Sequence, residues 1–231
     1  MRRANISLES EKSSSLSPYL LLRIFFAACI ILGPVTFFVY GILAPQGRGG
    51  QAIIAANIAE NPLLNQLHLL FGVLASFFLP IGFLGLSLLA LRRSPWLGSL
   101  SVILSLPGWT PLSGLITLDA LSYDIAQIGG GPQFVALWNR FNSDAVLFSY
   151  TFIYAVCHLL CAVLVGIALG RTRLIPLWAA VAIILFTPLL IIGFPTHLFI
   201  LLLLSLVVLE IGSLPAALVM LKGRNELASI T

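Results

Sequence analysis

The chain has 231 residues, of which 59% are hydrophobic and only 9% are charged. Soluble domains carry about 25% charged residues, because their surface must stay in contact with water. This composition excludes a water-soluble fold and predicts an integral membrane protein whose main partner is the lipid bilayer. The net charge of +4 is dispersed along the chain, so no nucleic-acid partner is expected.

Six apolar runs are long enough to cross a bilayer. About 20 residues of helix span a ~30 Å hydrocarbon core, and no run shows the strict alternation of a membrane β-strand. We therefore expect an all-α bundle of six transmembrane helices, with spans near residues 24–43, 64–91, 96–118, 145–170, 174–194 and 197–221. Residues 1–22 are predicted to be a disordered cytoplasmic tail and residues 223–231 a second cytoplasmic tail.

The positions of Lys and Arg predict the orientation of these spans. Ten of the twelve fall before the first run, after the sixth, or in the connections between runs two and three and between runs four and five. Only Arg48 and Arg140 fall in the other connections. Because cytoplasmic loops are enriched in Lys and Arg, both termini are expected in the cytoplasm.

Two outer connections contain helical signals. Residues 51–61 are expected to form a short helix before Pro62 opens the second span. In the connection 119–144, apolar residues recur with the spacing of an amphipathic helix at the membrane interface: Phe134, Leu137, Trp138 and Phe141. That helix is either a lid over a site or a cover on the end of the bundle.

Small residues in the fourth run permit a close helix contact. Ala162, Gly166 and Gly170 recur every four residues, as in helix pairs that approach closely within membranes. This stripe packs either inside the monomer or along the seam of a homodimer. The three cysteines all fall inside apolar runs, so no disulfide framework is expected.

Counting helical turns from the basic helix ends gives each polar side chain a height in the bilayer. Glu210 and His158 lie 12 and 13 residues from such ends, which is roughly 18–20 Å and close to the bilayer centre. A charged side chain is costly there and should face the inside of the bundle. The candidate ligand-binding residues at this level are Glu210, His158, Trp109, Thr110 and Tyr154. Alternatively, Glu210 locks the last helix to a neighbour and His158 is structural.

A second polar layer falls roughly 36–40 Å up by the same count, at the outer rim. It contains His68, Asp119, Asp144 and His197. Two imidazoles and two carboxylates suit a divalent metal. However, polar residues are normal at helix ends, and no pair has the spacing of a metal-binding motif. These four are weak metal candidates, and neither a catalytic residue nor a cofactor is assigned.

Four short motifs follow one another between about Arg23 and Gly223: Ala55-Ala56-Asn57-Ile58, Gly166 to Arg171, Ile175-Pro176-Leu177-Trp178 and Glu210-Ile211-Gly212. In their order and spacing the chain resembles a family of uncharacterised bacterial six-helix membrane proteins. The resemblance implies six helices in a bacterial inner membrane. It implies no activity, so no functional residue is carried over.

These observations favour a non-enzymatic binding or transport module for a small or apolar ligand held at the central layer. Two alternatives stay open. One is a membrane enzyme working at the outer rim through the second polar layer. The other is a structural or regulatory partner protein in the membrane.

Overall fold

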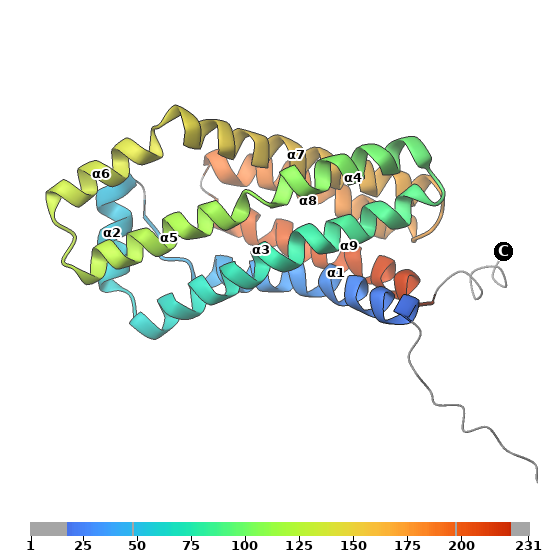
Figure 1. Cartoon of the computed structure of the whole chain (residues 1–231), viewed down its shortest axis with the longest axis horizontal. Helices are drawn as coiled ribbons and strands as arrows, with labels where there is room; N and C mark the ends of the chain where they lie inside the picture. The colour runs from blue at the N-terminus through green and yellow to red at the C-terminus, as the bar shows by residue number, and fades with distance from the viewer. Residues whose placement is uncertain (1–17, 48, 197, 223–231) are drawn as a thin grey trace, which may run out of the picture.

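The computed structural model describes residues 18–47, 49–196 and 198–222, and this part of the chain is helical without a strand (Figure 1). The helices are α1 (Pro18–Leu43), α2 (Gly49–Ala59), α3 (Pro62–Leu91), α4 (Pro95–Trp109), α5 (Leu112–Gln127), α6 (Pro132–Asn142), α7 (Ala145–Arg171), α8 (Leu177–Thr196) and α9 (Phe199–Lys222). The two predicted short helices are confirmed as α2 and α6. His197 and the predicted tails at 1–17 and 223–231 lie outside the described residues.

Five helical segments are long and apolar enough to cross a membrane: α1, α3, α4 with α5, α7 and α9. The Leu177–Gly193 part of α8 is a shorter apolar helix. The prediction of an all-α, multi-pass membrane protein is therefore confirmed at this level.

The long helices form a closed ring in chain order. α1 packs on α3, α3 on α4, α4 on α7, α7 on α8 and α8 on α9, and α9 returns to α1. The short helices gather at the end of the ring away from the start of α1 (Figure 1). There α2 packs against α5 and α6, and α5 also packs against α3.

Side-chain caps fix where α3 and α7 begin. The Asn61 side chain accepts a hydrogen bond from the Leu63 N–H at 2.9 Å, and Asp144 accepts one from the Val146 N–H at 2.8 Å. Such caps satisfy backbone donors that a helix leaves unpaired in its first turn. The predicted opening of a span at Pro62 is confirmed, and Asp144 serves as a helix cap.

Two predicted boundaries are wrong. Residues 18–22 are helical and not part of a tail, because α1 begins at Pro18, a residue well suited to the first helical position. The third run does not end near 118 but continues as α5 to Gln127, so Asp119 lies within a helix. A break separates α4 from α5 where Pro111 lacks the N–H that would continue the hydrogen-bond ladder.

Glycines allow two pairs of helices to approach through their backbones. A Cβ at Gly82 of α3 would lie 2.7 Å from the Cys29 carbonyl oxygen of α1. A Cβ at Gly108 of α4 would lie 2.6 Å from the backbone nitrogen of His158 in α7. The small-residue stripe of α7 is likewise occupied within the monomer, because Gly166 and Gly170 face α8.

Replacing Gly82 by Ala is expected to destabilise the fold by about 1–3 kcal/mol, because the added methyl group overlaps the backbone of α1. Thermal unfolding of the purified protein in detergent measures this as a lower midpoint temperature. Phe77→Leu on the same helix is the matched control, since Phe77 is 63% exposed. Equal midpoints for Gly82→Ala and wild type would contradict the close α1–α3 contact.

Candidate functional site

A cavity of about 360 Å³ lies inside the ring beside the short helices. Polar side chains from α1, α2, α3 and α5 line one part of it, which we call the polar wall: Tyr40, Asn57, His68, Asp119 and Ser122. Of these helices, α1, α2 and α5 also contribute apolar side chains to the lining: Phe37, Ile53, Leu112 and Leu115. The opposite wall is apolar and comes from α8 and α9: Leu190, Phe199, Leu202, Leu203 and Leu206. α6 contributes no residue to this lining and packs on α2 and α7 instead.

Helical spacing brings the polar wall together. On α5 the cavity-lining residues are Leu112, Leu115, Asp119 and Ser122, which recur every three or four positions. Residues with this spacing share one face of a helix. Polar residues near the end of α5 therefore face the bundle, where they meet α2 and α3.

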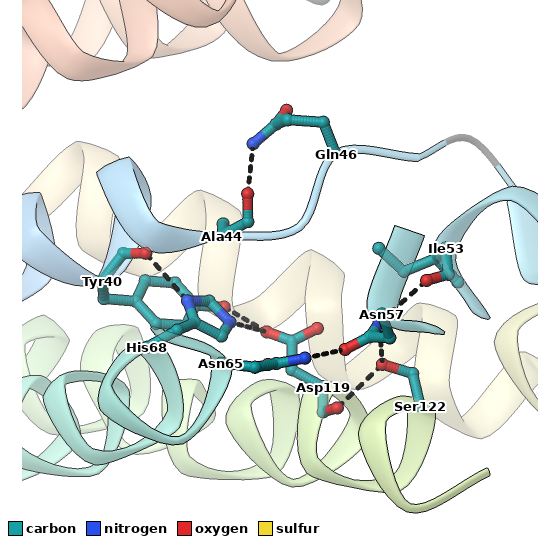
Figure 2. A network of polar contacts seen from close by, with 9 residues as sticks. All are labelled: Tyr40, Ala44, Gln46, Ile53, Asn57, Asn65, His68, Asp119 and Ser122. Atoms are coloured by element: carbon teal, nitrogen blue, oxygen red, sulfur yellow. Dashed lines mark hydrogen bonds and ion pairs between the residues drawn. The ribbon is translucent and has the colours of Figure 1, made fainter. Parts of the chain in front are cut away.

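The centre of the polar wall is a contact between Tyr40, His68 and Asp119 (Figure 2). The Tyr40 hydroxyl donates a short hydrogen bond to Asp119 Oδ2. His68 Nδ1 lies 2.8 Å from the Tyr40 carbonyl oxygen, and His68 Nε2 lies 3.9 Å from Asp119 Oδ2. Because a carbonyl oxygen only accepts, Nδ1 carries a hydrogen and Nε2 is the ring nitrogen that faces the carboxylate.

Three amide and hydroxyl side chains extend this contact to α2 (Figure 2). Asn65 Nδ2 donates to Asn57 Oδ1 at 2.5 Å, and Asn57 Nδ2 donates to Ser122 Oγ at 3.3 Å. Ser122 Oγ in turn donates to the Asp119 carbonyl oxygen at 2.7 Å. Asn57 and Asn65 are 4% and 1% exposed, so these bonds hold α2 to α3 and α5 where water does not compete.

Three of the central-layer candidates meet in an aromatic cluster. The Trp109 ring centroid lies 6.0 Å from that of Tyr154 and 4.9 Å from that of His158. Phe83 and Phe186 pack on the same indole, and Trp109 is fully buried. Tyr154 also lines the cavity, so the cluster forms its inner floor.

Glu210 and Thr110 lie apart from that cluster. Within the described residues Glu210 makes no hydrogen bond or ion pair with His158, and its buried Oε2 has no partner. Glu210 lies one helical turn before Ser213 on α9. Ser213 lines a small void together with Cys29 and Pro34 of α1. Thr110 is exposed, because successive helical residues point about 100° apart and Trp109 takes the inward direction.

The outer-rim candidates divide in the same way. His68 and Asp119 are brought together, Asp144 caps α7, and His197 lies outside the described residues. In the described ranges no three His, Cys, Asp or Glu side chains gather as metal ligands. The arrangement there consists of one carboxylate, one imidazole and one phenol.

Sequence reasoning missed Tyr40, Asn57, Asn65 and Ser122 as parts of the site. One signal was available, because Asn65 and His68 lie three residues apart on the face of α3 that also carries Gly72 and Ala75. The contacts of Tyr40 and Asn57 depend on how α1 and α2 fold back on α3. No spacing within one helix predicts them.

Comparison of the chain with protein-family models, with curated proteins and with solved structures finds no match.

Asn57→Leu is expected to loosen α2, because it leaves the buried Asn65 amide without its acceptor and removes the hydrogen bond from α2 to Ser122 of α5. An unsatisfied buried polar group costs about 1–3 kcal/mol, which corresponds to hydrogen exchange of α2 peptides that is faster by a factor of roughly 5 to 150. Gln51→Leu, at an exposed position of the same helix, is the control. Equal exchange rates in the two variants would contradict the proposed anchoring of α2.

Proposed function

We propose that the chain is a six-span protein of a bacterial cytoplasmic membrane that binds or transports a small amphipathic molecule in this cavity. The observation that carries the proposal is a largely apolar cavity whose polar wall faces leucines and a phenylalanine of α8 and α9. Ligand pockets have volumes of about 300–1,000 Å³ and combine apolar lining with a few polar groups. A molecule with a polar head and a short apolar tail fits both walls at once.

The position of the polar wall supports the same ligand class. By helical counting, His68 and Asp119 belong near the outer interface, where the polar heads of amphipathic molecules reside. Below them the aromatic cluster around Trp109 closes the inside of the ring. A ligand therefore has its head near the rim and its tail against α8 and α9.

The closed ring supports six spans, because α8 lies between α7 and α9 and completes it. The ends that carry basic residues also lie together. Arg23 Nε donates to the Met220 carbonyl at 3.0 Å, and the turns after α3 and α7 lie at that same end (Figure 1). Trp96 and Trp178 are 84% and 56% exposed beside these turns, as in an interfacial aromatic belt. This end is therefore the cytoplasmic one in our proposal.

Cysteine labelling tests this orientation. A membrane-impermeant maleimide should label Ser143→Cys, between α6 and α7, in intact cells, because that turn lies at the outer end. Ser94→Cys, between α3 and α4, should react only after the membrane is opened. The parent chain, whose cysteines lie within α1 and α7, gives the background. Labelling with the opposite pattern would overturn the orientation.

Photolabelling tests the binding site. In nanodiscs, an alkyl alcohol carrying a diazirine should label the α9 residues of the apolar wall, as mapped by peptide mass spectrometry. Gly41→Leu should reduce this label several-fold, because its side chain enters the cavity, where a Cβ already lies 3.3 Å from Leu203. Leu204→Phe adds bulk to the lipid-facing side of α9 and should leave the label unchanged, since Leu204 is 43% exposed.

Equal labelling of wild type and Gly41→Leu would overturn the proposal, as would label confined to lipid-facing positions. Recovery of a chemically altered alcohol would instead favour the second candidate, a membrane enzyme. That reading is supported by the acid–base pair His68 and Asp119 in the cavity wall.

A further inference from the structure

The Asp119 carboxylate offers an unused acceptor to the cavity. Its Oδ2 accepts the hydrogen bond from Tyr40, whereas Oδ1 makes no hydrogen bond among the described residues. The side chain is 37% exposed and lines the cavity, so a ligand can reach this oxygen. Asp119 is also the one charged side chain in the described part of the lining.

His68 adds a second acceptor at the same place. Its Nδ1 hydrogen is committed to the Tyr40 carbonyl, so in its neutral form the ring presents the Nε2 lone pair, 3.9 Å from Asp119 Oδ2. The Tyr40 hydroxyl satisfies Asp119 Oδ2, which leaves Asp119 Oδ1 and the neutral His68 Nε2 as two acceptors that one ligand can use. Donors that carry a positive charge form the strongest hydrogen bonds to such groups.

The Tyr40 side chain holds both acceptors in position, His68 by stacking and Asp119 by its hydroxyl hydrogen bond. The Tyr40 ring stacks with His68, at a centroid distance of 4.2 Å, and with Phe37, at 5.6 Å. Both ring pairs are nearly parallel, with interplanar angles of 16° and 10°. The polar wall is therefore organised before a ligand arrives, which lowers the entropy cost of binding.

We infer that the ligand of this cavity is a primary ammonium with a short apolar tail. Its N–H groups donate to Asp119 and to His68 Nε2, and its tail packs on the leucines of α8 and α9. This inference rests on the proposed function and names the class of ligand. The ligand must carry an N–H donor as well as a positive charge. A quaternary ammonium of the same length has the charge but no N–H, so it should bind more weakly.

Competition against the photolabel of α9 in phosphatidylcholine nanodiscs tests this ligand class. The competitors are octylammonium, octyltrimethylammonium and 1-octanol, compared at equal measured concentrations in the bilayer. In wild type, octylammonium should displace the label about tenfold more strongly than either of the others, the size expected for a hydrogen bond to a charged group. In Asp119→Asn this preference should fall to about twofold or less, while labelling by the alkyl alcohol persists and shows that the variant is folded.

Equal displacement by octylammonium and 1-octanol in wild type would overturn the ligand class and leave the proposed binding function standing. Equal displacement by octylammonium and octyltrimethylammonium would overturn the requirement for a donor. An undiminished preference in Asp119→Asn would show that the ammonium binds elsewhere and would also overturn the inference. Failure of the alcohol itself to label α9 in wild type would overturn the proposed function.

Discussion

The contact between the first and last long helices is the constraint on which the core and the cavity depend. α9 packs on both α8 and α1 and so closes the ring. At its end, the Arg23 guanidinium donates to the carbonyl oxygens of Met220 and Leu221. The last carbonyls of a helix lack partners within it and carry partial negative charge, so a cation satisfies both needs. Because helices are stiff, a seam fixed at this end also sets where α1 and α9 face each other at the other end.

The closed ring divides its interior into a packed floor and an open cavity. Around Trp109 the rings of Phe83, Tyr154, His158 and Phe186 fill the space between α3, α4, α7 and α8. Beyond Tyr154 the helices α1 and α5 carry polar side chains, and α9 carries leucines that do not fill the space between them. A packed floor beside an incompletely filled cavity is consistent with the proposed binding of a ligand at this end of the ring.

The sequence predicted elements and levels well, because both follow from local rules. Apolar runs set the helices, and helical rise predicted a common level for His68 and Asp119 and for Trp109 and His158, pairs that lie close together in the structure. The same count put Glu210 level with His158, and these two described residues make no hydrogen bond or ion pair with each other. The sequence predicted partners poorly. The third run was ended too early, just before Asp119, although Asp119 and Ser122 lie within α5 and face the cavity and the neighbouring helices. The network of Tyr40, Asn57 and Asn65 joins three helices, and its geometry exists only after they pack.

The difference between a residue's level and its packing partners also explains why Asp119, and not Glu210, defines the site. From the sequence Glu210 is the stronger signal, since a carboxyl at the bilayer centre is expensive and Asp119 lies near a rim. What a carboxyl does there depends on its neighbours. The Glu210 oxygen that is buried has no partner in the described part of the chain, and the void beside Ser213 admits no water-sized group. Asp119 has a phenol donor, a facing imidazole and a cavity. The depth of a carboxyl in the bilayer predicts only that the protein must stabilise it. Several partners that converge on a carboxyl beside a cavity indicate a binding role.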